Sequence, residues 1–159
     1  MSGKAKALAE RYKQENAEFL TLIEGLSEDQ WNKRCPDETR TVGVVAHHMA
    51  TNSIIIAEWA KQLGNGQAIE GFNRNLVDRV NAQHAQENIG TGKAETVELE
   101  NKNTAEAVKI IEGLSDEQLN TAAPHSLFGG NPVSAQQLIE NGLIGHLQSH
   151  LKSIRDALV

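Results

Sequence analysis

The sequence is poor in cysteine, proline and aromatic residues. Its 159 residues contain one cysteine, Cys35, three prolines and only 4% aromatic residues. A lone cysteine excludes an internal disulfide and a zinc cluster built from several thiolates, so a metal site would need histidine or carboxylate ligands. The scarcity of aromatic residues, with no long alternating β-branched runs, disfavours an all-β sandwich or barrel. The composition therefore favours a helical protein.

Positive charge is also scarce. Fifteen Lys and Arg residues against 21 Asp and Glu residues give a formal net charge of −6, which disfavours a nucleic acid partner. No apolar run resembles a secretory signal or a membrane span, because polar residues interrupt the most apolar stretch, 42–60. We therefore expect residues 1–159 to form a single domain in the cytoplasm, with no membrane partner.

Hydrophobic residues recur at alternating spacings of three and four, which is the period of an amphipathic helix. This pattern predicts four long helices and a shorter one between the second and third. The long helices are expected near residues 8–25, 41–63, 94–112 and 132–159, and the short helix near 76–85.

Two of these helices have candidate N-caps. Thr39 or Thr41 can cap the second long helix, and Asn131 followed by Pro132 can open the fourth. In the third long helix, the spacing predicts that the inward stripe consists of Val97, Asn101, Ala105, Val108 and either Ile111 or Glu112.

One ten-residue segment occurs twice in similar form. Residues 23–32 read IEGLSEDQWN and residues 111–120 read IEGLSDEQLN, and each copy is followed by a proline at the same offset. Both copies place Ser three residues before Gln, which is the spacing of a capping box. Two copies are too few for a solenoid, so the repeat predicts an all-α four-helix bundle of two similar helical hairpins.

Three of the six histidines have the spacing of a metal site. At about 100° per residue, His48 falls near the apolar face of its helix and His47 falls on the other side. His146 and His150 lie one turn apart and lean toward the apolar face of the fourth helix, so both can bind one cation while His48 supplies a third ligand. Three protein ligands leave coordination positions open, as in a catalytic site.

Two other classes of metal site do not fit the sequence. A zincin needs Glu directly after its first His, but Leu147 follows His146. Ferritin-like di-iron sites use Glu-x-x-His pairs, and none of the six histidines has Glu three positions before it. The sequence thus predicts a mononuclear site for one divalent transition metal, zinc or nickel first, with iron or manganese as alternatives.

The remaining candidate residues are less informative. His84 lies in the expected short helix, where it can line a pocket or lie on the surface. His47 is expected to be exposed, and His125 follows Pro124 in a loop. The sequence does not establish a cationic pocket beside Cys35, so we do not propose it as a nucleophile.

In their order and spacing, these motifs resemble the DinB/YfiT-like superfamily of metalloenzymes. Residues 41–50 (TVGVVAHHMA) are similar to the family's Ser/Thr-Val-x-x-Val-x-x-His-Leu-Ala element, although Gly43 and Val44 replace polar residues. The two Gly-Leu-Ser-x-x-Gln segments, residues 77–82 (VDRVNA) and the final His-x-x-x-His extend the likeness over nearly the whole chain. The resemblance implies an up-down-down-up bundle in which His48, His146 and His150 hold a divalent metal.

The resemblance also implies a chemistry. Characterised branches of the family include S-transferases and isomerases that use low-molecular-weight thiols. We therefore expect a metal-dependent transferase or hydrolase that activates a thiol or water toward a small electrophile, with Asn81 and His84 as candidate substrate-binding residues. Because the chain has little thiol of its own, a reacting thiol would be a cosubstrate. The alternative is a non-catalytic, metal-stabilised bundle that serves as a stress-related binding module, and either protein could be a monomer or a homodimer.

Overall fold

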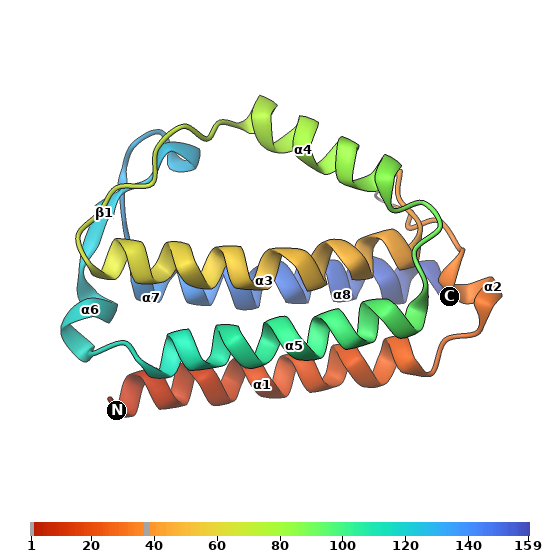
Figure 1. The fold of residues 1–159 in the computed structure, drawn as a ribbon, viewed down its shortest axis with the longest axis horizontal. Helices are drawn as coiled ribbons and strands as arrows, with labels where there is room; N and C mark the ends of the chain where they lie inside the picture. Colours follow the sequence, from red (N-terminus) through yellow and green to blue (C-terminus); the bar gives the residue numbers. More distant parts are fainter. Residues whose placement is uncertain (1, 37–38) are drawn as a thin grey trace.

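The computed structural model describes residues 2–36 and 39–159, and it is mostly helical (Figure 1). The long helices are α1 (Gly3–Glu24), α3 (Val42–Gly64), α5 (Lys93–Glu112) and a C-terminal stretch of α7 (Ala135–Gln137), the π-helical segment η2 (Leu138–Ile144) and α8 (Gly145–Ala157). The connections contain the short helices α2 (Glu28–Trp31), α4 (Arg74–Glu87) and α6 (Asp116–Asn120), and the 3₁₀ turn η1 (Ser126–Phe128). The predicted four-helix bundle is confirmed.

The long helices pack side by side around one hydrophobic core. α5 packs against both α3 and α1, while the C-terminal stretch packs against α3 and α1. The colour gradient of Figure 1 shows that α1 and α8 run in one direction and α3 and α5 in the other. Because α3 and α5 are parallel, their connection must return along the bundle, and α4 lies in this crossover.

Serine and threonine caps determine where most of these helices begin. Of the two predicted caps for α3, Thr41 is the one used, since its hydroxyl accepts a hydrogen bond from the Val44 amide at 3.3 Å. The repeated segment forms two capping boxes as predicted, one at Ser27 with Gln30 and one at Ser115 with Gln118. Each box opens a short helix after a long one.

The predicted start of the fourth long helix is wrong. Pro132 lies in strand β2 (Pro132–Ser134), which pairs antiparallel with β1 (Ala122–Pro124), and the helix begins after Ser134 in a capping box with Gln137. Asn131 is exposed, and its side chain donates to the Phe128 carbonyl at 2.7 Å instead of capping a helix. Pro132 pairs with Pro124, a position where neither residue can donate a backbone hydrogen bond.

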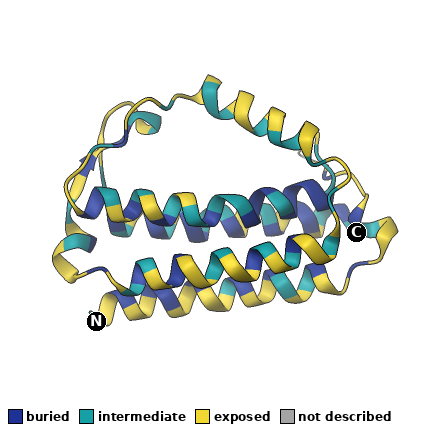
Figure 2. Cartoon of the chain, in the orientation of Figure 1, coloured by how far each residue is buried: buried dark blue, intermediate teal, exposed yellow. Residues whose placement is uncertain are grey.

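The predicted inward stripe of α5 is wrong in part. Val108 and Ile111 are buried, but Asn101 and Ala105 are exposed (Figure 2). Helix α5 packs against both α1 and α3, so a wider part of its surface is buried. That part includes polar residues, which a hydrophobic pattern does not detect. The buried residues of α5 are Thr96, Glu100, Ala107, Val108 and Ile111.

Gly43, one of the two departures from the family pattern, has a packing role. A Cβ atom at this position would lie 2.5 Å from Nε1 of Trp31, far inside van der Waals contact. The Trp31 indole is buried and donates from Nε1 to the Thr91 carbonyl at 3.0 Å. Glycine therefore lets α2 and the connection before α5 close over the start of α3.

Helix α4 lies apart from the core. None of its residues is buried, and among the long helices it packs mainly against α3 (Figures 1 and 2). Over residues 2–36 and 39–159, no helix is both long enough and apolar enough to cross a membrane.

Candidate metal centre

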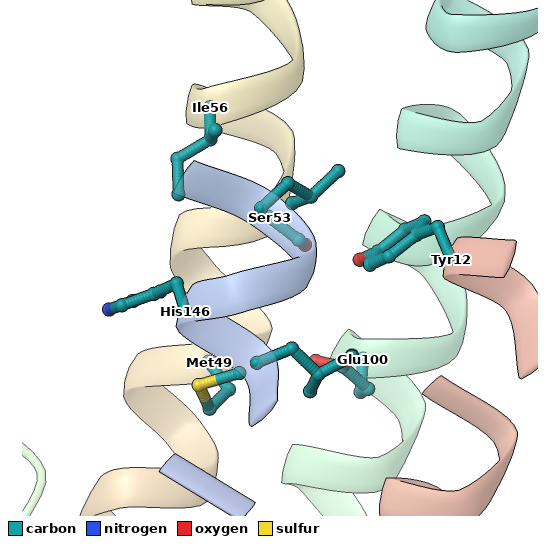
Figure 3. A pocket seen from close by; sticks show the side chains of 8 residues that line it. Tyr12, Met49, Ser53, Ile56, Glu100 and His146 are labelled. Carbon is teal, nitrogen blue, oxygen red and sulfur yellow. The ribbon is translucent and has the colours of Figure 1, made fainter. Parts of the chain in front are cut away.

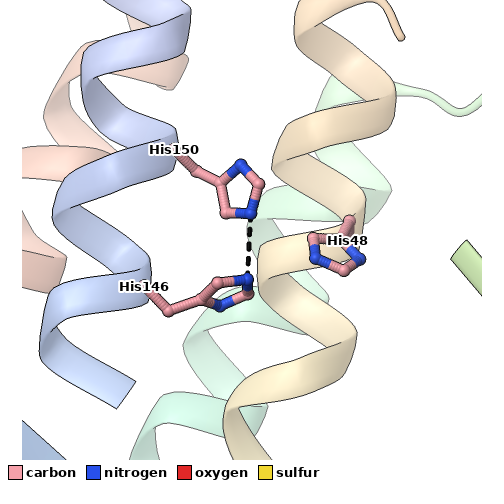
Figure 4. Close-up of side chains that lie close together, drawn as sticks. All are labelled: His48, His146 and His150. Atoms are coloured by element: carbon pink, nitrogen blue, oxygen red, sulfur yellow. Dashed lines mark hydrogen bonds between the residues drawn. The ribbon is translucent and has the colours of Figure 1, made fainter. Parts of the chain in front are cut away.

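The structure brings together the three histidines that the sequence selected. His48 projects from α3, and His146 and His150 project from α8 toward it (Figure 4). One ring nitrogen of each residue lies within 4.8 Å of the others. The ring centroid of His48 is 5.3 Å from that of His146 and 5.1 Å from that of His150. The predicted cluster of side chains thus exists, and metal binding by it stays a prediction.

The two histidines of α8 meet because they lie one turn apart. Their Nε2 atoms are 2.9 Å apart, and their rings are nearly perpendicular. The π-helical segment η2 immediately precedes α8, and its wider turn changes the direction in which the following side chains point. Segments of this kind are frequent at functional sites.

His48 is held in its neutral form. The residue is 4% exposed, and burial, together with the smaller effects of the Arg40 charge and the neighbouring imidazoles, lowers the pKa of its imidazole to about 2. A neutral imidazole keeps the lone pair that a metal needs, whereas a protonated one repels a cation.

Asn52 contacts His48 and was not found from the sequence. Its amide nitrogen lies 2.9 Å from Nδ1 and 3.0 Å from Nε2 of the His48 ring. Asn52 follows His48 by four residues on α3, so the two side chains share one helix face. That spacing is the signal that could have identified it as a residue that orients His48.

The donor set suits a transition metal. Two nitrogens bound at 2.0–2.1 Å to a tetrahedral metal would be roughly 3.3 Å apart, against the 2.9 Å between the Nε2 atoms of His146 and His150. A small opening of this pair would therefore admit a cation. The three imidazoles come from two helices, with His48 buried and His146 and His150 half-buried, and three protein ligands leave a coordination position for another ligand.

The expectation that His47 would be exposed is wrong. His47 is half-buried, and its Nδ1 lies 2.8 Å from Nε2 of His84, which α4 carries to the same side of α3. Burial lowers the pKa of both imidazoles. His84 is also half-buried, and its ring centroid is 5.8 Å from that of His48. His84 is therefore not an open surface residue but lies at the edge of the triad, and its part in a pocket stays a prediction.

The other candidate residues lie on α4 and in the connecting segments. Asn81 is half-buried on α4, one turn before His84. His125 is in a loop as expected, but it is fully buried, with Trp59 and Phe128 at ring distances of 5.4 and 5.0 Å. Cys35 is fully buried.

A buried carboxyl group lies on the other side of the α3–α8 pair and was also missed. Glu100 is 1% exposed, and burial raises the pKa of its carboxyl to about 7. Burial likewise raises the pKa of the Tyr12 phenol. A glutamate inside a polar stretch of sequence carries no signal of burial, because only the packing of α5 between two helices encloses it.

Comparisons with known proteins agree with the fold. A family profile described as the DinB superfamily matches residues 11–154. The structure of YfiT from Bacillus subtilis aligns with a TM-score of 0.71 and 13% sequence identity, over 99% of this chain and 86% of that one. YfiT is described as a probable metal-dependent hydrolase with an unusual four-helix bundle topology. No curated protein matches the sequence significantly.

Proposed function

The chain belongs to the DinB superfamily, and on this premise we propose that it is a metal-dependent enzyme acting on a small electrophilic molecule. The observation that carries the proposal is the convergence of three imidazoles from α3 and α8. His48, His146 and His150 would hold one divalent transition metal, zinc or nickel first. Such a metal would lower the pKa of a thiol or water molecule that reaches it.

The surrounding residues support this chemistry. Burial keeps the His48 imidazole neutral, and Asn52 restrains its ring. The positive charge of half-buried Arg40 lowers the pKa of both His48 and His84, so the same charge favours the anionic form of a nucleophile nearby. The chain thus supplies a positively polarised site even though its net charge is −6.

Helix α4 supplies the candidate substrate-binding residues. Nδ1 of His84 is buried and has no hydrogen-bond partner among the described residues, so it offers a polar contact for a substrate beside the triad. Asn81 lies one turn earlier on α4 and would extend this contact surface.

The nucleophile would come from outside the chain. Cys35 is fully buried, so neither the sequence nor the packing offers a protein thiol for transfer. A low-molecular-weight thiol would make the enzyme an S-transferase, and water would make it a hydrolase. The description of YfiT as a probable metal-dependent hydrolase supports the second reaction.

Metal titration tests the proposal. Protein stripped with a chelator is titrated with zinc and with nickel by calorimetry, alongside the variants His48→Gln, His146→Gln and His150→Gln. We expect each variant to lose at least about tenfold in affinity, because even residues behind the ligands affect affinity by 10–100-fold. The matched control His47→Gln changes the neighbouring histidine and should bind almost as wild type. If the metal affinity of all three variants equals that of the wild type, the proposal is wrong.

Turnover then separates an enzyme from a binding module. The metal-loaded protein is assayed with thiols paired with alkylating electrophiles, and with activated esters and amides in water. We expect turnover that disappears in His146→Gln. Metal-dependent thermal stabilisation without turnover in either panel would favour the non-catalytic bundle, in which the cation ties α3 to α8.

A further inference from the structure

A small polar cavity lies inside the bundle, between α1, α3, α5 and the start of α8. Its volume is about 10 Å³, which is roughly the room that one water molecule needs. Figure 3 shows the oxygens of Tyr12, Ser53 and Glu100 directed toward this space, while the imidazole of His146 points away from it. The cavity is therefore distinct from the candidate metal centre, although His146 forms part of its wall.

Two of the polar atoms at this cavity lack partners in the described chain. Oε1 of Glu100 accepts from the Thr104 hydroxyl at 3.1 Å, but Oε2 of Glu100 and Oγ of Ser53 have no hydrogen bond of good geometry among residues 2–36 and 39–159, although the Tyr12 phenol interacts with the Ser53 and Thr104 hydroxyls. Glu100 is 1% exposed and Ser53 5% exposed, so bulk solvent does not satisfy them. An unsatisfied buried polar group destabilises the folded state, so these two atoms favour a polar occupant of the cavity.

We propose that this cavity is a binding site for one water molecule that bridges Oε2 of Glu100 and Oγ of Ser53. Cavities with two to four polar groups hold water, whereas purely apolar cavities stay dry. A monovalent cation fits less well, because the remaining wall is largely apolar, with Met49 and Leu147 among its residues, and supplies few oxygen ligands.

The bridge would join helices that make few polar contacts with one another. Ser53 belongs to α3, Glu100 to α5 and Tyr12 to α1, so one water would connect the central helices at the level of His146. The water would thereby stabilise the packing behind the helix that carries two of the three histidines. This inference does not depend on metal binding or on catalysis.

Nuclear magnetic resonance detects such a water directly. The chain has two methionines, so methyl labelling gives a simple spectrum in which the Met49 methyl reports on the cavity wall. We expect a nuclear Overhauser effect between this methyl and water, with the sign of a long-lived complex. Oxygen-17 relaxation dispersion, which labile hydroxyl protons do not affect, should count that water among the long-lived ones.

A variant that fills the cavity completes the test. Ser53→Val should lower the number of long-lived waters by one and destabilise the protein, since Glu100 loses its bridge. Thr51→Val, on the same helix and outside the cavity, is the control and should keep the water. If Ser53→Val does not fold, the Overhauser and oxygen-17 measurements on the wild-type protein alone decide whether the water is bound. The absence of a long-lived water in wild type, or stability that depends on sodium, potassium or ammonium at constant ionic strength, would overturn the proposal.

Discussion

Nδ1 of His47 lies 2.8 Å from Nε2 of His84, so a hydrogen bond between two imidazoles joins α4 to α3 beside the triad. One ring must donate and the other accept, which requires at least one neutral imidazole. Burial lowers the pKa of both, which favours the neutral forms. Since no residue of α4 is buried, this bond is one of the few contacts we expect to hold the helix in place.

Replacing His84 by alanine should loosen α4. Losing a hydrogen bond worth about 0.5–1.5 kcal/mol would raise amide exchange across α4 roughly 2–13-fold. Hydrogen exchange read by mass spectrometry over residues 74–87 measures this. The control is Gln86→Ala, an exposed position on the same helix. Equal exchange in the two variants would show that other contacts hold α4.

Asn52 should affect metal affinity without being a ligand. Asn52→Ala removes the group within 3.0 Å of both ring nitrogens of His48, so we expect zinc affinity to fall about 10–100-fold. Asn52→Asp replaces the amide donor by a carboxylate, which would accept from the free ring N–H of a metal-bound His48, as carboxylates commonly do behind histidine ligands, and should retain most of the affinity. Calorimetric titration of both variants measures the difference, and equal affinity in Asn52→Ala and wild type would contradict the prediction.

Glu100→Gln should become more stabilising as the pH rises. The carboxyl of Glu100 has a folded-state pKa of about 7, raised from 4.5, so the folded protein binds more protons than the unfolded chain between these values. The stabilisation of the fold that comes from this raised pKa is fully present below pH 4.5 and is lost as the pH rises through 7. The stability of Glu100→Gln relative to wild type should therefore increase by about 3 kcal/mol from pH 4.5 to pH 8.

Urea denaturation at several pH values measures this difference between the two proteins. Comparing them at each pH cancels the histidine titrations that they share. A difference that stays constant with pH would mean that Glu100 titrates in the folded protein as it does in the unfolded chain.

Gly43→Ala should destabilise the fold. The added methyl would meet the Trp31 indole at 2.5 Å, and Trp31 can move away only by giving up its hydrogen bond to Thr91. Overpacking of this kind costs about 1–3 kcal/mol. Chemical denaturation measures the loss, with Gly3→Ala as a control because a Cβ there meets nothing within 4 Å. Equal stability of the two variants would show that α2 shifts without cost.

The start of the C-terminal helical stretch can be tested in the same way. Ser134→Ala removes the hydrogen bond that the Ser134 hydroxyl accepts from the Gln137 amide, one of the two in the capping box, and should cost about 1 kcal/mol. Pro132→Ala, in the short strand before it, should cost clearly less, because no helix begins there. If thermal denaturation shows a larger loss of stability in Pro132→Ala than in Ser134→Ala, the helix begins at Pro132 instead.

The histidine cluster could be predicted because helix geometry alone determines it. A spacing of four residues brings His146 and His150 together on any α-helix, and the angular position of His48 relative to its apolar neighbours distinguished it from His47. Both arguments use local geometry, which the sequence contains. The repeated capping boxes succeeded for the same reason, since their hydrogen bonds lie within four residues.

The failures share a dependence on distant partners. His47 was assigned to solvent because the crossover that brings His84 against it lies 37 residues away. Asn131 has a good capping side chain, but the pairing of Pro132 with Pro124 extends the chain there. Glu100 is enclosed by α1 and α3 together, and the residues near it in the sequence give no sign of this burial.

Helix α4 lies beside the candidate site but is not part of the core that positions the three histidines. The three histidines belong to helices whose other residues build the core, so substitutions near them are constrained by packing. Helix α4 carries no buried residue, yet the parallel course of α3 and α5 obliges the crossover that contains it to pass along the bundle. Substitutions on the exposed positions of α4 are therefore less limited by core packing than substitutions on α3 or α8, and they can change which molecules reach the histidines while the same scaffold presents them.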